Sequence, residues 1–484
     1  MKIIFVSSEI VPFASTGGLG DVCAALPQAL VKEGVEVVRF MPLYQDIDRE
    51  KFALEKVDVE LHIPLGHAWF RGSVWKGARN GVVTYYVHGA EFFDRPGIYG
   101  NAEHGYADNF ERFLFFQKAV VRLIDDWEMK PDVVHCNDWQ TGLLPMLLYH
   151  GIDGTFRDGR EKTLMTIHNL AHQGWAPAQK FYMTQLPDSC FTMHTLEFYG
   201  EINALKGGIV GATAINAVSP TYAEEIKTPE FGCKLNGALY HRQAVLSGIL
   251  NGIDHTRWNP KTDTHIAANY SSEDLSGKKK CKTALQTACG FNPDPKIPLL
   301  GIITRLVPQK GVDLLAGVME RVVASGARIV ILGTGDARYE EACQEWARRW
   351  PEQVCSWMEF SNDKAHKIEA GVDMFLMPSE FEPCGQNQLY SMRYGTIPVA
   401  RAVGGLEDSV IDFAKKGGTG FKFKEYTADA FFECLERAFA VYENRTRWNA
   451  LMKRAMKQDF SVKHMARDYV ALYRKILSTN ETVD

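Results

Sequence analysis

Short apolar runs alternate with longer helix-period segments along the whole chain. The runs are rich in β-branched residues and lack a strict period of two, as expected for strands that are buried on both faces. A helix is predicted from Asp21 to Glu33, where Gly34 ends it. In the first half the runs predict strands at Lys2–Ser7, Val35–Met41, Asp132–His135, Leu164–Ile167, Ala214–Val218 and Gly248–Leu250. Strand, crossover helix, strand is the pattern of a parallel α/β sheet.

The same alternation restarts after the polar stretch Asn259–Lys282. We interpret this stretch as the crossing between two domains followed by an exposed helix start. Its lysines are interpreted as a solvated face; they are Lys278, Lys279, Lys280 and Lys282. Beyond it the pattern predicts strands at Pro298–Thr304, Arg328–Leu332 and Asp373–Met377, with helices at Gly311–Ala324 and Asn387–Tyr394. The amphipathic segment Val462–Leu477 predicts a last helix.

Composition and charge exclude several classes of protein. The chain has 484 residues, of which 46% are hydrophobic and 23% charged, so it is neither disordered nor collagen-like. A net charge of −5 gives no support for a nucleic-acid or membrane partner. The first apolar stretch ends at Ser7, too short for a signal peptide, and no run reaches the ~20 apolar residues of a membrane helix. The 10 cysteines form no CxxC pair and no zinc spacing, so we expect free thiols and a cytoplasmic location.

Open parallel sheets bind ligands at the carboxyl ends of their strands, so the residues that follow predicted strands are the candidates. Gly17 and Gly18 follow the first strand and open a helix. They indicate either a tight turn or a backbone that approaches an anion, with equal weight. Asp138 follows a later strand, where it could hold a sugar or cap the next helix. His168 follows another, and is either a sugar ligand or a satisfied structural residue.

In the second half, Arg305 and Lys310 straddle a strand-to-helix turn. Cations at a helix start oppose the helix dipole, which favours a bound diphosphate over a salt-bridged turn. The carboxylates Glu380 and Glu382 precede Gly385, where another helix is predicted to begin. Carboxylates, cations and glycines at so many strand ends indicate an anionic, hydroxylated ligand such as a nucleotide sugar. No metal motif is evident, so we expect catalysis without a protein-bound metal or cofactor.

A string of motifs in a fixed order then shows a resemblance. They are STGGLGDV, YADNFERF, NDWQTGLLP, TIHNLAHQG, NAVSPTYAEEI, GILNGID, ITRLVPQKG, FEPCGQNQL and VGGLEDSV. Together they resemble the bacterial glycogen synthase and starch synthase family, over nearly the whole chain. The resemblance implies the GT-B fold, an α/β architecture of two Rossmann-like domains facing across a deep cleft that holds the active site. It implies residues 1–250 plus the C-terminal helix 462–484 as the N-terminal, acceptor-side domain, and residues 251–461 as the nucleotide-sugar domain.

The resemblance also implies an activity: transfer of glucose, with retention, from ADP-glucose to the non-reducing end of an α-1,4-glucan, glycogen or a maltooligosaccharide. UDP-glucose is the alternative donor. The implied catalytic residues are Glu382, Asp138, His168, Arg305 and Lys310. The implied donor-binding residues are Ser15, Gly17, Gly18, Tyr99, Asn251, Gly385, Gln386 and Asn387, and the acceptor-side residues are Asp21 and Asn169.

The chain departs from the family pattern at four positions. Ser15 stands where the family typically has a lysine linked to the donor phosphates, and His172, Gln386 and Val462 replace other usual residues. Two alternatives to the synthase therefore stay open. One is a glucan-binding regulatory protein with weak or lost transferase activity, for which Ser15 is the motive. The other is the same fold with different chemistry, such as a sugar phosphorylase, for which no cofactor motif is present.

Overall fold

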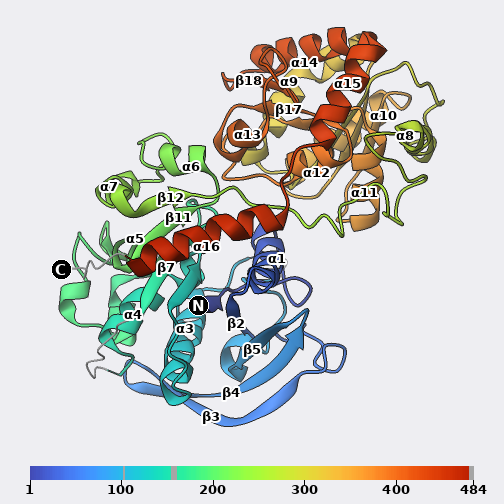
Figure 1. Cartoon of the computed structure of the whole chain (residues 1–484). Coiled ribbons are helices and arrows are strands. Elements are labelled where there is room, and N and C mark those ends of the chain that lie inside the picture. The colour runs from blue at the N-terminus through green and yellow to red at the C-terminus, as the bar shows by residue number, and fades with distance from the viewer. Residues whose placement is uncertain (102–103, 154–160, 479–484) are drawn as a thin grey trace. The chain divides into compact units, whose positions relative to one another are not determined.

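The computed structural model describes residues 1–101, 104–153 and 161–478, and the chain divides into two compact units. Unit 1 comprises Met1–Ile249 together with the described chain from Val462 onward, and unit 2 comprises Leu250–Ser461. Figure 1 shows the elements of both, coloured along the chain. Of the C-terminal segment 462–484 expected for the first domain, residues 479–484 lie outside the described residues.

Unit 1 is built on a 9-stranded sheet whose pairings are parallel except at one edge, where β4 pairs antiparallel with both β5 and β3. In spatial order the strands are β12 (Leu246–Gly248), β11 (Ala214–Ala217), β7 (Lys162–Ile167), β6 (Val133–Asn137), β1 (Lys2–Val6), β2 (Glu36–Pro42), β5 (Val82–His88), β4 (Ala68–Arg79) and β3 (Glu55–Leu65). The predicted parallel strands are present, with the last displaced toward the N-terminus as β12. A small 3-stranded sheet adds β8 (Trp175–Pro177), β10 (Glu201–Asn203) and β9 (Glu197–Phe198).

The sequence pattern did not predict the antiparallel edge formed by β3, β4 and β5. The hairpin strands β3 and β4 carry Glu, Lys, Asp and Arg at their exposed positions, and their pairing shifts register between Lys56 and Glu60. Such residues are depleted in strands. Their strand conformation comes from ladder pairing with β5, and charge on an edge strand also discourages pairing with other chains.

The C-terminal helix α16 (Val462–Ser478) packs in unit 1 against α1 (Gly18–Lys32), although the two lie at opposite ends of the sequence (Figure 1). Its Tyr473 hydroxyl lies 2.7 Å from His135 Nδ1 on β6, and Asn216 of β11 donates to the Tyr469 hydroxyl at 2.9 Å. These buried bonds fix the last helix across the sheet. The other helices of unit 1 are α2 (Ala90–Phe93), α3 (Asn109–Asp126), α4 (Leu144–His150), α5 (Ala204–Gly211), α6 (Pro220–Glu225) and α7 (Asn236–His241).

Unit 2 is built on a 6-stranded sheet in which all strands are parallel. In spatial order they are β15 (Val354–Trp357), β14 (Arg328–Leu332), β13 (Leu299–Ile303), β16 (Met374–Met377), β17 (Ile397–Arg401) and β18 (Phe421–Phe423). Its helices are α8 (Ser276–Ala288), α9 (Val312–Ala324), α10 (Ala337–Arg349), α11 (Asn362–Gly371), α12 (Asn387–Arg393), α13 (Gly404–Ser409), α14 (Ala428–Glu443) and α15 (Arg445–Met456).

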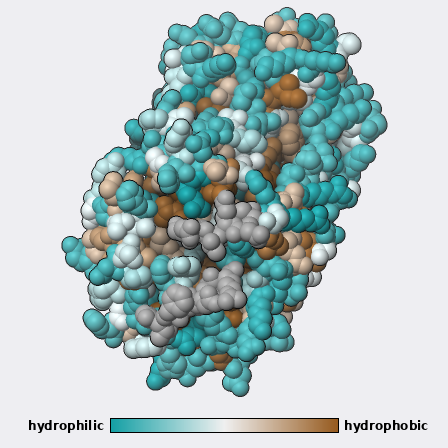
Figure 2. All heavy atoms as spheres, turned by 60° about the vertical axis from the view of Figure 1, so that its left-hand side comes forward, coloured by the Kyte–Doolittle hydropathy of each residue, from teal (hydrophilic) through white to brown (hydrophobic). Residues whose placement is uncertain are grey.

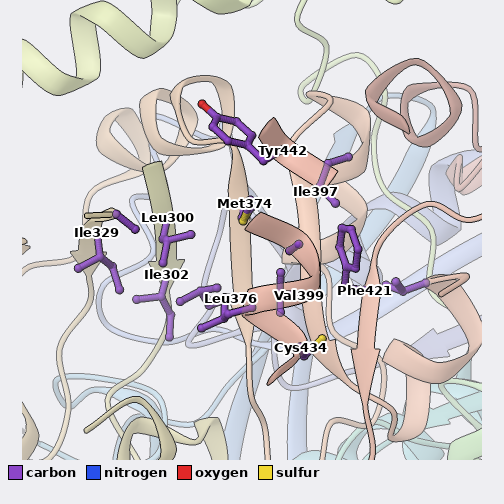
Figure 3. Close-up of a cluster of buried hydrophobic side chains, with 14 of the residues drawn as sticks. Leu300, Ile302, Ile329, Met374, Leu376, Ile397, Val399, Phe421, Cys434 and Tyr442 are labelled. Carbon is purple, nitrogen blue, oxygen red and sulfur yellow. The ribbon is translucent and has the colours of Figure 1, made fainter. Parts of the chain in front are cut away.

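The core of unit 2 lies between this sheet and its helices. Figure 3 shows side chains of neighbouring strands, among them Leu300, Met374 and Val399, together with Cys434 and Tyr442 of α14. The apolar residues of α9 recur at three- and four-residue steps and are buried, which sets the helix face that packs on the core. They are Val312, Leu315, Val318, Met319 and Val322.

The interpretation of the stretch Asn259–Lys282 was wrong in two respects. It lies inside unit 2 rather than between the units. Lys278 and Lys282 are each only 6% exposed, while Lys279 and Lys280 are exposed. Lys278 donates to Thr396 and to the Ala370 carbonyl, and Lys282 donates to Asp373 at 2.7 Å. The two lysines one helical turn apart on α8 thus face the core, because buried acceptors compensate their desolvation.

Each of the cysteines is free, as predicted, and only Cys233 is exposed. Within the described ranges no helix is long and apolar enough to cross a membrane. The face drawn in Figure 2 is mostly hydrophilic, with hydrophobic residues in small areas between. That is the usual surface of a globular protein.

Replacing Lys282 with methionine tests the corrected role of the α8 lysines. The change leaves the buried Asp373 carboxylate without its cation, so we expect the free energy of unfolding to fall by about 3–5 kcal/mol. The exposed neighbour Lys280→Met is the matched control and should stay within about 0.5 kcal/mol of wild type. Chemical denaturation of both variants measures the difference; equal stabilities would show that the Lys282–Asp373 pair contributes little.

Candidate functional site

In unit 1, polar side chains gather where three neighbouring strands end. Glu9 follows β1, Asp138 follows β6 and His168 follows β7, and these strands are adjacent in the sheet. The backbone N–H of His168 donates to Asp138 Oδ1 at 2.7 Å, so the ends of β6 and β7 are tied through a carboxylate. The structure therefore brings together Asp138 and His168, two residues that the sequence analysis singled out.

Asp138 is held in a costly state. It is 7% exposed, and its φ of 56° and ψ of −175° lie in a region that side chains rarely adopt, at a cost of about 1–3 kcal/mol. Burial raises the pKa of its carboxyl to about 7, against the lowering effect of the His168 and Asn169 N–H groups. Its side chain makes no capping hydrogen bond to the helix that follows, so the capping interpretation of Asp138 is wrong.

His168 is a neutral imidazole with a defined tautomer. The Asn137 amide nitrogen donates to the Val6 carbonyl, which turns Asn137 Oδ1 toward His168 Nε2 at 2.9 Å. His168 therefore carries its proton on Nε2 and leaves Nδ1 as an acceptor. Burial lowers the pKa of the ring to about 3. A neutral ring with a free acceptor suits a hydroxyl donor better than it suits an anion.

The glycine loop, defined here as Ser15–Gly20, leads into the first turn of α1. Gly17 precedes the helix with an extended φ of −175°, and a Cβ placed on it would meet nothing within 4 Å. A tight turn therefore does not require glycine at this position, which favours close approach by a ligand. Ser15 donates to the Gly17 carbonyl at 3.0 Å, and Asp21 lies in the first turn of the helix.

Glu9 and Tyr99 form a network that links this loop to β1. Glu9 accepts from the Thr16 N–H at 2.6 Å, the Thr16 hydroxyl at 2.9 Å and the Tyr99 hydroxyl at 2.6 Å. Tyr99 Oη also lies 2.9 Å from the Ser8 hydroxyl. Glu9 was not among the site residues predicted from the sequence, although it follows a predicted strand just as Asp138 does.

In unit 2, a carboxylate and an ammonium group meet at the ends of β13 and β16. Lys310 Nζ lies 2.6 Å from Glu382 Oε2, and the Ser379 hydroxyl donates to the same oxygen at 3.1 Å. Glu382 is 5% exposed and Lys310 is partly exposed. The structure brings together these two sequence-predicted residues, and it adds Ser379, a second hydroxyl partner that the motif analysis passed over.

Arg305 lies in the turn between β13 and Lys310. Its side chain is exposed and makes no ion pair or hydrogen bond to any described residue. An unpaired guanidinium two residues beyond a buried strand is available to a diphosphate, for which its planar array of donors is suited. The turn thus combines the two arrangements that the sequence left open: Lys310 is salt-bridged, and the Arg305 side chain has no partner among the residues with a described structure.

The start of α12 lies beside these groups. Gln386 is the N-cap residue and accepts from Tyr390, while Asn387 donates to the Ile303 carbonyl of β13 at 2.7 Å. Gly404, with φ of 42°, allows the loop after β17 to pack on the Glu382 backbone: a Cβ there would lie 2.0 Å from the Glu382 carbonyl oxygen. The backbone around Glu382 is therefore tightly enclosed.

The remaining residues predicted from the sequence, Asn251, Asn169 and Gly18, lie near the groups described above within their own units. In unit 2, Asn251 is 5% exposed beside Cys384, the neighbour of Gly385, and its Oδ1 accepts no hydrogen bond from the described residues. In unit 1, Asn169 accepts from the Ala171 N–H and Gly18 begins α1. Within the described residues, no group of three or more His, Cys, Asp or Glu residues is arranged to hold a metal ion.

Comparison with known proteins decides the family. The model of the starch synthase catalytic domain matches residues 2–241, and the model of glycosyl transferases group 1 matches residues 290–454. A glycogen synthase from Anaeromyxobacter dehalogenans is 43% identical, with 98% of this chain and 99% of the relative covered. The chain belongs to the glycogen synthase and starch synthase family. A glycogen synthase 2 from Geobacter sulfurreducens is 42% identical over 99% of both chains.

The solved structures agree with this family. The catalytic domain of starch synthase IV from Arabidopsis thaliana, bound to ADP and acarbose, has a TM-score of 0.91 and 32% identity, covering 99% of both chains. Sucrose-phosphate synthase from Thermosynechococcus elongatus, with a TM-score of 0.61 and 17% identity, shares the fold alone. The GT-B fold expected from the motifs is confirmed, and this member of the glycogen synthase and starch synthase family is a glucosyltransferase.

Asp138 should make the stability of the protein depend on pH. The unfolded carboxyl has a pKa near 3.9, whereas the native one is raised to about 7. Between these values the native state holds a proton that the unfolded state has lost. The free energy of unfolding therefore falls as the pH rises through this window, by up to ~1.4 kcal/mol per pH unit from this group.

The Asp138→Asn variant removes this titration and keeps an acceptor for the His168 N–H. We expect the stability of the variant relative to wild type to increase from about pH 5 to pH 7 and to level off above. Urea unfolding at several pH values measures it. Parallel pH profiles for the two proteins would contradict the raised pKa of Asp138.

Proposed function

We propose that this chain extends an α-1,4-glucan by transferring glucose from ADP-glucose with retention of configuration. The observation that carries the proposal is the Arabidopsis starch synthase IV structure, which matches 99% of this chain and is bound to ADP and acarbose. ADP is the leaving group of ADP-glucose, and acarbose is a sugar-like molecule. The curated glycogen synthases of similar length support glycogen as the polymer.

The groups of unit 2 suit the departure of a nucleoside diphosphate. The Arg305 side chain has no partner among the described residues and can bind two phosphate oxygens. The Lys310 ammonium has three N–H donors, of which Glu382 takes one. Both cations would stabilise the charge that develops on the leaving diphosphate. We place the donor phosphates here, at the turn after β13, with Gly385, Gln386 and the Asn387 backbone at the start of α12.

Glu382 is proposed to face the transferred glucose. Lys310 and Ser379 both contact its Oε2, and no donor among the residues that the structure describes contacts its Oε1. A fixed carboxylate next to the anomeric carbon would stabilise the positive charge of an oxocarbenium-like transition state. Because the backbone around Glu382 is enclosed by Gly404, the carboxylate would need little reorganisation during the reaction.

The groups of unit 1 are proposed to bind the sugar hydroxyls and to contribute backbone N–H groups to the nucleotide-sugar donor. His168 offers its neutral Nδ1 as an acceptor, and Asp138, with its pKa near 7, can accept or donate close to neutral pH. Asp21 and Asn169 are assigned to the acceptor side. Gly17, Gly18 and Tyr99 are assigned to the donor, since the glycine loop presents backbone N–H groups at the start of α1.

Ser15 makes donor choice the sharpest test of this proposal. The glycine loop contains no lysine or arginine, and the Ser15 hydroxyl donates its hydrogen bond to the Gly17 carbonyl. Incorporation of labelled glucose into glycogen, with ADP-glucose and UDP-glucose compared at equal concentrations, measures the preference. We expect ADP-glucose to be used preferentially. Preference for UDP-glucose would overturn the donor assignment, and no incorporation from either donor would favour a glucan-binding protein without transferase activity.

Glu382→Ala tests the role of the carboxylate in the transition state. We expect kcat to fall by on the order of 10²-fold or more, as is typical when a preorganised electrostatic contact is lost. Glu380→Gln is the matched control: this exposed carboxylate lies two residues away and should leave kcat within about 2-fold of wild type. Steady-state kinetics with the preferred donor checks both. A Glu382→Ala enzyme with near-normal kcat would refute the assigned role.

A further inference from the structure

Glu9 is a buried carboxylate that the proposed reaction does not use. It is 3% exposed and forms no ion pair with any described residue. An ionised carboxylate without a cation is costly inside a protein unless hydrogen bonds replace the lost water. Glu9 satisfies this condition with neutral donors only: the Thr16 N–H, the Thr16 hydroxyl and the Tyr99 hydroxyl. Such a costly arrangement indicates a purpose beyond the packing of β1.

The three donors belong to two segments that are far apart in the sequence. Thr16 lies in the glycine loop, directly before Gly17, and Tyr99 lies between α2 and α3. The backbone N–H and the hydroxyl of Thr16 both donate to Glu9, so the backbone and the side chain of Thr16 are both held by this carboxylate. One side chain at the end of β1 therefore sets the place of the loop and of the Tyr99 hydroxyl together.

We infer that Glu9 is a positioning residue that fixes the glycine loop and Tyr99 for binding of the nucleotide sugar. The inference rests on the proposed function, because it assigns the loop to the donor. Glu9 is assigned no contact with the nucleotide sugar itself and acts only through Thr16 and Tyr99.

The absence of a cation in the loop is what makes its position decisive. A lysine side chain could adjust to a phosphate over several ångströms, whereas backbone N–H groups bind only where the backbone places them. In this chain Ser15 carries no charge and bonds to the Gly17 carbonyl. The loop's contribution to donor binding therefore depends on its anchor, and small displacements of a positioned group cost large factors in rate.

Two substitutions of Glu9 separate positioning from charge. Glutamine has the same shape: its amide oxygen can accept from the obligate Thr16 N–H donor, and its NH₂ group can donate to the two hydroxyls, which are able to rotate. Alanine removes all three bonds. We expect Glu9→Ala to raise the KM for ADP-glucose about 10-fold or more, with the KM for glycogen changed less than 2-fold, and Glu9→Gln to restore the donor KM to within about 3-fold of wild type.

Glu111→Ala is the control for general destabilisation. Glu111 is a largely buried carboxylate of α3, in the same unit, and pairs with Lys180 at 2.5 Å. It contacts neither the glycine loop nor Tyr99 through any bond among the described residues. We expect this variant to lose thermal stability while its KM for ADP-glucose stays within 2-fold of wild type.

The experiment combines steady-state kinetics for both substrates, thermal unfolding, and the affinity of each variant for ADP by calorimetry. A donor KM unchanged in Glu9→Ala would overturn the inference. Equal loss in Glu9→Gln and Glu9→Ala would also overturn it, since the charge and not the position would then matter. If Glu9→Ala raised the KM values for ADP-glucose and glycogen equally, and Glu111→Ala raised them too as its melting temperature fell, the role of Glu9 would be merely structural. If wild type neither turns over either nucleotide sugar nor binds ADP, the proposed function itself fails.

Discussion

The ends of buried parallel strands are where this protein has to place its polar chemistry. Both sheets are covered, so the strand interiors are apolar, and β1, β6, β13 and β16 are almost entirely buried. Most polar side chains of these strands therefore come where the chain leaves the sheet, whereas His135 and Asn216, which lie inside strands, are hydrogen-bonded to α16. Because parallel strands all leave at the same edge, residues from distant segments arrive side by side there. Their side chains are then partly out of water and need partners.

The two units provide these partners in different ways. In unit 1 the carboxylates Glu9 and Asp138 are surrounded by neutral N–H and O–H donors, and burial keeps the Asp138 proton affinity high. In unit 2 the Glu382 carboxylate pairs with Lys310, and a second cation, Arg305, has no ion-pair partner in the part of the chain that the structure describes. Unit 1 therefore offers hydrogen-bonding groups of little net positive charge, which suit sugar hydroxyls. Unit 2 offers surplus positive charge, which suits phosphates.

Paired charges also stabilise the scaffold far from these groups. Lys282 of α8 reaches Asp373, which directly precedes β16, and the Tyr442 hydroxyl of α14. This network ties two helices to the start of a strand whose other end leads to Glu382. The four lysines of one short sequence therefore differ in environment: Lys278 and Lys282, one helical turn apart, hold the helix to the core, and Lys279 and Lys280 are exposed.

Local sequence was a good guide wherever one element decides its own conformation. Nine of the parallel strands, the helices that follow Gly311 and Gln386, and the last helix were predicted, because an apolar run or a helical period is imposed by the faces it buries. The parallel strands β5, β15, β17 and β18 were not predicted. The β3–β4 hairpin was not, since its strand conformation depends on pairing with β5. The burial of Lys278 and Lys282 was not either, since their acceptors lie about a hundred residues away along the chain.

The same division holds for the candidate site. The sequence by itself determined the family, the fold and the strand ends that carry Asp138, His168, Arg305, Lys310 and Glu382, because residue types and their order are recorded in it. Only the tertiary structure decided which of these groups are partnered: that Lys310 pairs with Glu382 while Arg305 stays unpaired, that His168 is neutral, and that Glu9 anchors the glycine loop. The hydrogen-bond and ion-pair partners of a group and its pKa depend on distances between segments that are remote in sequence. Burial determines how strongly groups at a given distance interact.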